Sequence, residues 1–350
     1  MVAGRVCRCT HDAGRGPPRA GFPGHLRRDP NWHTGRVSVP LIVLVGPTAT
    51  GKSRLAVDIA CVLRDRGRDA EIVNADSMLV YRGMDIGTAK PDEAERRGVP
   101  HHLIDIAEVT ERASVADFQV QARAVIARLR ERGTVPVMVG GSPLYTRAVI
   151  DVFDFPGSDA QVRARWEAEL DRVGAHALHA ALAERAPESA AAIEPGNGRR
   201  IVRALEVLEL TGGHRPEIPA WTYALTDVHQ FGLNLERAEL DRRIDERVEE
   251  MWRLGLVDEV RTLLGRGLRD GRTAVRAIGY RQVVAHLDGE LTEAEAKADV
   301  QRATRAFFRK QLGWYRRDPR ITWLDAAAPD NAARVLAGLD SGQAKEVDDA

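Results

Sequence analysis

The chain has 350 residues, a length that suits one large domain or two. Hydrophobic residues make up 44% and charged residues 29%, an ordinary globular composition that excludes wholesale disorder. The 51 basic and 51 acidic residues cancel, so the whole chain is not a polycation, and any nucleic acid would bind a local basic patch.

The N-terminal stretch, residues 1–39, is rich in Arg, Gly and Pro and has no helical or strand period. We expect a disordered extension there; a start codon assigned too far upstream or an RNA-binding arm are the alternatives. The 3 Cys cannot form a disulfide framework, which favours a reducing compartment. No apolar run approaches the roughly 20 residues of a bilayer span. We therefore expect a cytoplasmic protein with no membrane contact.

Residues 40–155 alternate between strand and helix patterns. Leu41–Val45 and Val135–Val139 are continuous apolar runs, typical of buried parallel strands, and Ile72-Val73 indicates a further strand. A helix is predicted to follow the first strand, and another to begin at Ser114. This order predicts an α/β fold of the P-loop NTPase type: a parallel sheet flanked by helices, with ligands at the strand C-terminal ends.

The pattern changes over residues 156–221, which are rich in Ala, Arg and Glu and nearly without strand signal. We predict an all-helical insertion domain there. The strand pattern resumes at Phe231–Leu235, so residues 222–330 complete the α/β core. Residues 331–350 are expected to be a C-terminal tail.

A phosphate-binding motif follows the first strand. It matches GxxxxGK[ST] fully and consists of Gly46, Pro47, Thr48, Ala49, Thr50, Gly51, Lys52 and Ser53. Its glycines let backbone N–H groups point into the loop, and the next helix adds a positive N-terminal end. Lys52 would contact terminal phosphate oxygens, and Ser53 would hold Mg²⁺. The motif predicts a ligand that carries a pyrophosphate, without specifying which one.

Asp76 follows the second strand, beside this phosphate site. A carboxylate there could take a proton, bind Mg²⁺ or simply open a turn, and the residues alone leave these three readings open.

Eight segments, in order, carry a resemblance to a known family. They are GPTATGKS (46–53), ADSMLVYRGMDIGTAKP (75–91), HHLID (101–105), VGGSPLY (139–145), RRIVRALEVLELTG (199–212), ELDRRIDERVEEM (239–251), RAIGYRQ (276–282) and TRAFFRKQLGWYRRDPRITWLD (304–325). Over about residues 40–325 the chain strongly resembles the tRNA dimethylallyltransferase family.

The resemblance implies a reaction. A dimethylallyl group moves from dimethylallyl diphosphate to N6 of adenosine 37 in the anticodon loop of tRNAs that read codons beginning with U. Lys52, the loop amides and Mg²⁺ would neutralise the leaving diphosphate, Arg247 would stabilise it, and Asp76 would be the base. Ser142 stands where the family usually has Thr; its hydroxyl would bond Asp76 or the adenine, or else cap the next helix. We expect a monomer.

The resemblance also nominates tRNA contacts on the anticodon stem-loop. They are Asp76, Ser77, Met78, Leu79, Ser142, Arg163, Arg199, Arg200, Arg203, Arg276, Gly279, Tyr280 and Arg281. Arg199 departs from the family, in which Gln is usual, so we expect a phosphate contact there in place of a base contact. Arg302, Arg305 and Arg309 fall at helical spacing and could grip RNA backbone or form an ordinary solvated face.

Two other functions fit parts of the chain. A P-loop small-molecule kinase shares the loop and a helical insertion that could serve as a lid, but has no need of the Asp76–Pro91 segment. A GTP-dependent RNA-binding switch is disfavoured because no NKxD guanine signature occurs.

Overall fold

The protein is described by a computed structural model over residues 38–213 and 220–346, with side chains through 339; the predicted extension 1–39 lies almost wholly outside these residues. The fold is built on a six-stranded sheet of order β3-β2-β4-β1-β5-β6, in which every neighbouring pair is parallel. The strands are β1 (Leu41–Val45), β2 (Ala70–Asn74), β3 (His101–His102), β4 (Val135–Val139), β5 (Val228–Asn234) and β6 (Thr322–Asp325). The predicted parallel α/β fold is confirmed.

Helices cover both faces of this sheet. The helices are α1 (Lys52–Asp65), α2 (Glu93–Arg96), α3 (Val115–Glu131), α4 (Pro143–Ile150), α5 (Ala160–Val173), α6 (Ala175–Arg185), α7 (Pro187–Ala191), α8 (Gly198–Thr211), α9 (Arg237–Arg253), α10 (Leu256–Gly265), α11 (Tyr280–Leu287), α12 (Glu293–Tyr315) and α13 (Asn331–Glu346), with short 3-10 turns η2 (Leu268–Asp270) and η3 (Ala274–Arg276).

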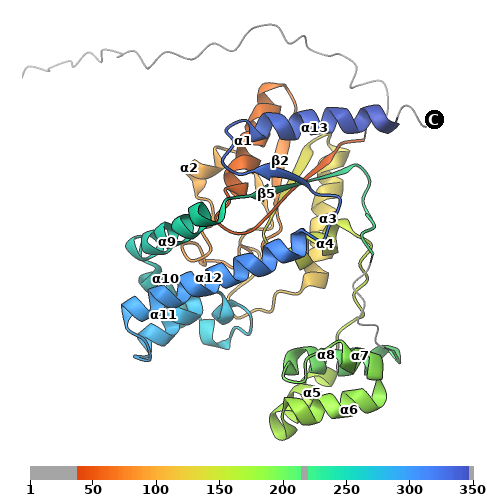
Figure 1. Ribbon diagram of the computed structural model, residues 1–350, viewed down its shortest axis with the longest axis vertical. Coiled ribbons are helices and arrows are strands. Elements are labelled where there is room, and N and C mark those ends of the chain that lie inside the picture. The colour runs from red at the N-terminus through yellow and green to blue at the C-terminus, as the bar shows by residue number, and fades with distance from the viewer. Residues whose placement is uncertain (1–37, 214–219, 347–350) are drawn as a thin grey trace, which may run out of the picture. The chain divides into compact units, whose positions relative to one another are not determined.

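The alternation of β1 side chains shows how the layers form. Ile42 and Leu44 pack with α1 and α13, which lie side by side over one face of the sheet (Figure 1). Leu41, Val43 and Val45 belong to the cluster formed with α3, α4 and α10–α12 on the other face. Because both faces are covered, every β1 residue is buried, as its unbroken apolar run predicts.

Three helix boundaries rest on local chemistry, and the one predicted at Ser114 is confirmed. Ser114 caps α3 by accepting a hydrogen bond from the Asp117 amide. Gly255 follows α9 in the left-handed region, at φ 97°. Thr292 and Glu295 form the capping box that begins α12, the long helix that later supplies a residue to the candidate site.

Where the sequence predicts an all-helical insertion, the chain forms α5 to α8, which share a core of their own around Leu178, Leu182, Ile201 and Leu205. The strands entering and leaving this unit pair with each other. The amide of Val152 donates to the Thr222 carbonyl at 2.8 Å, and that of Ala224 to the Ile150 carbonyl at 2.8 Å. The insertion is therefore joined to the α/β core by a two-stranded connection.

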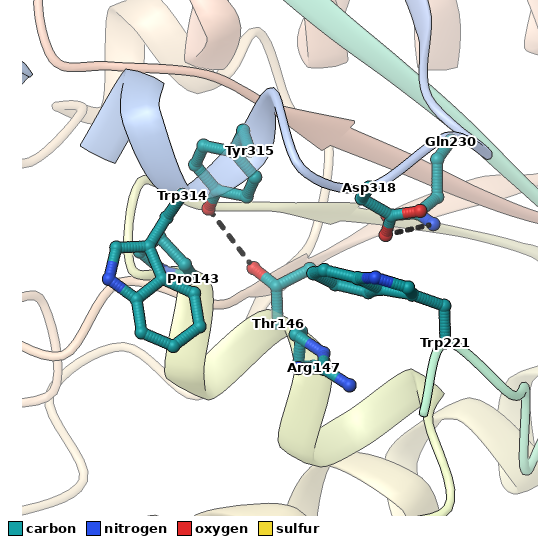
Figure 2. Close-up of a pocket in the computed structure, with 8 residues that line it drawn as sticks. All are labelled: Pro143, Thr146, Arg147, Trp221, Gln230, Trp314, Tyr315 and Asp318. Atoms are coloured by element: carbon teal, nitrogen blue, oxygen red, sulfur yellow. Dashed lines mark hydrogen bonds between the residues drawn. The ribbon is translucent and has the colours of Figure 1, made fainter. Parts of the chain in front are cut away.

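A buried charge network supports this connection. Asp151 is fully buried and accepts hydrogen bonds from Arg147 Nε at 2.8 Å and Arg320 Nη1 at 2.8 Å. The Arg147 guanidinium carbon lies 3.9 Å from the centroid of the Trp221 ring, so the two side chains stack. Figure 2 shows them together at a small cavity beside Asp318. Each charge has an opposite partner, as buried ions require, so we assign the network to stability.

The prediction of a tail from residue 331 is wrong for residues 331–346, which form α13. Val335, Leu336 and Leu339 are buried against the face that carries α1. Asn331 anchors the start of the helix by donating from Nδ2 to the Asp325 carbonyl at 2.8 Å. The sequence hides this helix because its apolar residues are few and its packing partners come from the other end of the chain.

Candidate active site

The sheet order determines which loops meet. β4 lies between β1 and β2, so the three loops that follow these strands lie together at their C-terminal ends. These loops are the P-loop (residues 46–51), the turn at Asp76 and the Gly140–Ser142 segment. Residues separated by almost a hundred positions in the sequence are thereby brought into one site.

The P-loop has the strained backbone that its motif predicts. Gly46 and Gly51 have φ of 137° and 84°, and Ala49 has φ of 64°. A Cβ at Gly46 would lie 2.8 Å from the Leu233 carbonyl oxygen, so only glycine fits there. Inside the loop, Thr50 Oγ1 donates to the Pro47 carbonyl at 2.9 Å, which fixes the turn from within.

Lys52 is the cation of this loop, and its Nζ donates to the Pro47 carbonyl at 2.5 Å. Burial lowers the pKa of Lys52 to about 8; Asp76 acts to raise this pKa and Arg247 to lower it. These interactions show that three charged groups from three different elements share one electrostatic environment. A phosphate anion bound to this loop would favour the protonated lysine.

The lowered pKa of Lys52 predicts a pH dependence. Above about pH 8 the free enzyme loses the ammonium charge that binds phosphate, so kcat/KM for the diphosphate donor falls. The kcat should stay constant to higher pH, because a bound phosphate group raises the pKa of Lys52. Initial rates between pH 6.5 and 10 measure both. In Lys52→Arg, whose guanidinium stays charged, the loss of kcat/KM near pH 8 should disappear; its persistence would assign the titration to another group.

Asp76 lies in a turn that Asn74 shapes. Asn74 Oδ1 accepts from the Asp76 amide at 2.8 Å, and its Nδ2 donates to the Asp76 carbonyl at 3.0 Å. Asp76 Oδ1 accepts from the Met78 amide at 2.9 Å, so the turn holds one carboxylate oxygen in place. The turn reading and the catalytic reading of Asp76 are therefore compatible, because one oxygen serves the turn.

Ser142 is the residue before α4, but its side chain makes no capping hydrogen bond, so the capping role is wrong. Its Oγ lies 3.2 Å from Ser77 Oγ and accepts from the Ser77 amide at 3.4 Å. The structure thus joins Ser142 to the residue after Asp76, and the predicted bond to Asp76 itself is not among the hydrogen bonds of the described residues.

Arg247 reaches the site from α9. Its Nη2 donates to the Thr88 carbonyl at 3.2 Å, and burial lowers its pKa while Asp76 and Glu95 act to raise it. A half-buried arginine that interacts electrostatically with Asp76 and Lys52 fits the predicted role at the diphosphate.

Three residues that the sequence reasoning missed support the loops of the site. The first, Lys90, lies within the Asp76–Pro91 segment. With only 4% of its side chain exposed, it donates to the Tyr81 carbonyl and ion-pairs with Asp85 and Asp105. The single signal for Lys90 was its rarity, since the chain has so few lysines.

Glu259 of α10 is the second of these residues. Its carboxylate accepts from the amides of Ile86 at 2.7 Å and Gly87 at 3.3 Å, and from the Tyr280 hydroxyl at 2.6 Å. Tyr280 is fully buried, and a Cβ at Gly87 would lie 2.5 Å from its ring. The predicted tRNA contact of the Tyr280 side chain is therefore wrong: it positions the loop. Gly279, also buried, donates its amide to Gln282 Oε1.

The third is Gln311 of α12, which is 3% exposed and bonds both the P-loop and Gly141.

The arginines nominated for tRNA fall into two groups. Arg163 and Arg203 pair with the fully buried carboxylate of Glu206, the former by Nε at 2.8 Å and the latter by Nη1 at 2.9 Å. Arg163 thereby links α5 to α8, and Arg203 links α8 to the segment before α5 through the Pro156 and Gly157 carbonyls, which limits the freedom of both to meet a phosphate. The second group is exposed and has no carboxylate within 3.5 Å in the described part of the chain. It consists of Arg199, Arg200, Arg276 and Arg281, the last of which lies 3.9 Å from Asp299.

Ser53 lies exposed in the first turn of α1, and its hydroxyl has no hydrogen-bond partner within the described residues. A lone hydroxyl beside a phosphate loop suits Mg²⁺, which takes few protein ligands and completes its shell with water and phosphate oxygens. No group of three or more His, Cys, Asp or Glu within residues 38–213 and 220–346 could hold a metal by itself. The donor set fits a cation that binds together with the substrate.

Comparisons with known proteins decide the family. The IPP transferase family model matches residues 79–318. A tRNA dimethylallyltransferase of Kineococcus radiotolerans is 58% identical over 310 residues, covering 86% of this chain and 97% of that protein. One of Thermobifida fusca is 57% identical over 303 residues, covering 85% and 93%. This chain belongs to the tRNA dimethylallyltransferase family.

Solved structures agree with this assignment. The tRNA isopentenylpyrophosphate transferase of Bacillus halodurans has a TM-score of 0.64 and 39% identity, over 88% of this chain and 99% of that one. A eukaryotic dimethylallyltransferase acting on tRNA, 24% identical with a TM-score of 0.71, shares the fold. The resemblance in the sequence is confirmed, and the kinase alternative is wrong. Within residues 38–213 and 220–346, no helix of this transferase is long and apolar enough to span a bilayer.

Proposed function

We propose that this tRNA-prenylating enzyme takes its dimethylallyl group from dimethylallyl diphosphate and transfers it to N6 of adenosine 37, in tRNAs that read codons beginning with U. The proposal rests on one observation: Lys52, Asp76 and Arg247 come from three elements and interact electrostatically at the ends of β1 and β2. Two cations for a leaving group and one carboxylate for an incoming amine are what this transfer needs.

On the donor side, the P-loop amides, Lys52 and Arg247 bind the diphosphate. As the C–O bond of the allyl diphosphate breaks, the electron pair leaves with the diphosphate, and these cations offset the charge that develops. Mg²⁺ held by Ser53 would supply further neutralisation when bound. Because the protein cations are half-buried, their attraction to the diphosphate is less screened than it would be at the surface.

On the acceptor side, the adenine must leave the stack of the anticodon loop to reach this site. Its N6 lone pair is delocalised into the ring, so the amine attacks well only as its proton leaves. The N6 lone pair forms the new C–N bond, and Asp76 takes the N6 proton through its second oxygen, since Oδ1 accepts from the Met78 amide. Ser77 and Ser142 offer hydroxyls beside this carboxylate.

The direct test incubates the enzyme, Mg²⁺ and unmodified tRNA with dimethylallyl diphosphate or with ATP. We expect prenylated tRNA and released pyrophosphate with the first donor and no ADP with the second. Mass spectrometry of nucleosides places the group on N6 of adenosine. Prenylation at another nucleoside would overturn the proposed acceptor, and a requirement for a different donor would overturn the proposed leaving group. We also propose a monomeric, cytoplasmic enzyme, which its mass in solution and cell fractionation would test.

Helix α12 offers a matched pair of arginines for testing phosphate contacts. Arg309 is exposed and has no carboxylate partner in the described part of the chain. Arg305 pairs with Asp241 and Asp245 of α9. We expect Arg309→Ala to flatten the slope of log K for tRNA against log salt by about 0.7–0.9, the size of one phosphate contact. Arg305→Ala should leave the slope unchanged and lower the melting temperature. Equal slopes in Arg309→Ala and wild type would place this face of α12 away from RNA.

A further inference from the structure

Gln311 joins the two sides of the site. It lies on α12 with 3% of its surface exposed. Its Oε1 accepts from the Thr48 amide of the P-loop at 3.3 Å, and its Nε2 donates to the Gly141 carbonyl of the loop after β4. One uncharged amide therefore bonds the P-loop through its oxygen and the Gly140–Ser142 segment through its nitrogen.

Gly141 is the point at which these parts converge. A Cβ at Gly141 would lie 2.8 Å from Gln311 Nε2, 3.5 Å from the Gly46 carbonyl oxygen and 3.8 Å from Asp76 Oδ2. The second oxygen of the proposed base and the start of the P-loop thus lie at contact distance around one backbone position, and a side chain there would collide with the Gln311 amide. A shift of Gln311 would disturb the spacing between the P-loop and Gly141, beside which the Asp76 carboxylate lies.

We propose that Gln311 is a positioning residue for prenyl transfer. Its amide sets the separation between the loop that holds the diphosphate and the carboxylate that receives the N6 proton, and this inference rests on the proposed roles of those two groups. Only a neutral group with both an acceptor and a donor can make these two bonds at once, which Gln does and an apolar or ionised side chain does not. A bonded and buried amide holds such a spacing closely, because leaving either partner unsatisfied is costly.

The role is one of geometry, so it predicts a loss in kcat more than in KM. A misplacement of about 1 Å between reacting groups can cost on the order of 10²-fold in rate. We expect Gln311→Met, which keeps the volume and removes both bonds, to lower kcat by about 10- to 100-fold. KM for tRNA should stay within about twofold of wild type, because the bonds of Gln311 are made to loops and not to RNA.

Gln311→Glu supplies a second, pH-dependent readout. The protonated Glu carboxyl has one donor and one acceptor and can imitate the amide, whereas the ionised form opposes the Gly141 carbonyl. We therefore expect the ratio of kcat in Gln311→Glu to kcat in Gln311→Met to rise as the pH is lowered from 8 to 5.5. The two variants are compared at each pH, so the titration of the other groups of the enzyme affects both alike.

Gln119→Met is the matched control. Gln119 of α3 donates from Nε2 to the carbonyls of Ala148 at 2.6 Å and Phe153 at 2.8 Å, and makes no bond to the P-loop or to Gly141. We expect it to lower the melting temperature and leave kcat unchanged. Circular dichroism and melting temperatures give the folded fraction of every variant, and each kcat is calculated per folded enzyme. If Gln311→Met does not fold, the pH series of Gln311→Glu is compared with wild type and tests the positioning role by itself.

Wild-type enzyme in the same assay separates the possible failures. If wild type does not prenylate tRNA, the proposed function fails. If wild type is active and kcat of folded Gln311→Met stays within twofold of it, or if Gln119→Met loses as much kcat, Gln311 is an ordinary core amide and the positioning role is overturned. A Gln311→Glu activity that does not recover at low pH relative to the Met variant would overturn it as well.

Discussion

Asp76→Asn is expected to lower the turnover of prenyl transfer at least ~10²-fold, the scale usual for removal of a general base. The amide is nearly isosteric with the carboxylate, and its oxygen can still accept from the Met78 amide, so the turn after β2 persists. What is lost is the capacity to take the N6 proton. The affinity for tRNA should remain near normal, as measured by filter binding or fluorescence anisotropy with the anticodon stem-loop.

Asp58→Asn is the control for Asp76→Asn. Asp58 lies on α1 and pairs with Arg97 at the surface, 2.6 Å away, where an ion pair contributes little. The same chemical change there should leave turnover at the wild-type level. Wild-type turnover in Asp76→Asn would remove this carboxylate from the mechanism and leave it the role of a turn residue alone.

Lys52→Ala is expected to abolish prenyl transfer, with a loss of ~10³-fold or more, because it removes the half-buried charge that would face the leaving group. It should not lower thermal stability through charge. Burial depresses the pKa of Lys52 to about 8, so the native state disfavours the protonated lysine at neutral pH, and this penalty is relieved only as the pH rises above 8. We therefore expect a melting temperature at pH 7 no lower than that of wild type.

Lys297→Ala tests whether this effect belongs to the P-loop. Lys297 is a surface lysine of α12 whose Nζ pairs with Glu249 at 2.9 Å and Glu293 at 3.1 Å. Its removal should leave turnover unchanged. A Lys52→Ala enzyme that still transfers the prenyl group would contradict a catalytic role for the loop cation. One that is unfolded by circular dichroism would contradict the predicted melting temperature.

The sequence by itself determined the features that local patterns encode. Apolar runs of strand length, the GxxxxGK[ST] motif and helix caps such as Thr292 depend on neighbouring residues only, so the sheet, the phosphate loop and several helix ends could be predicted. The family resemblance added roles for Asp76 and Arg247, which no local pattern assigns.

Only the tertiary structure decided which side chains support these groups. Gln311 and Glu259 bond segments that are far apart in the chain, and a single Gln or Glu in a helix carries no signal of such a partner. Lys90 bonds carboxylates nearer in the chain, but the turns that bring them together depend on the fold. The same reason explains the errors at Tyr280 and in α13. The sequence does not show that the Tyr280 hydroxyl bonds Glu259 inside the fold. Nor does it show that α13, whose large apolar residues are few, packs against α1. Partners distant in sequence, and not local propensity, determine these positions.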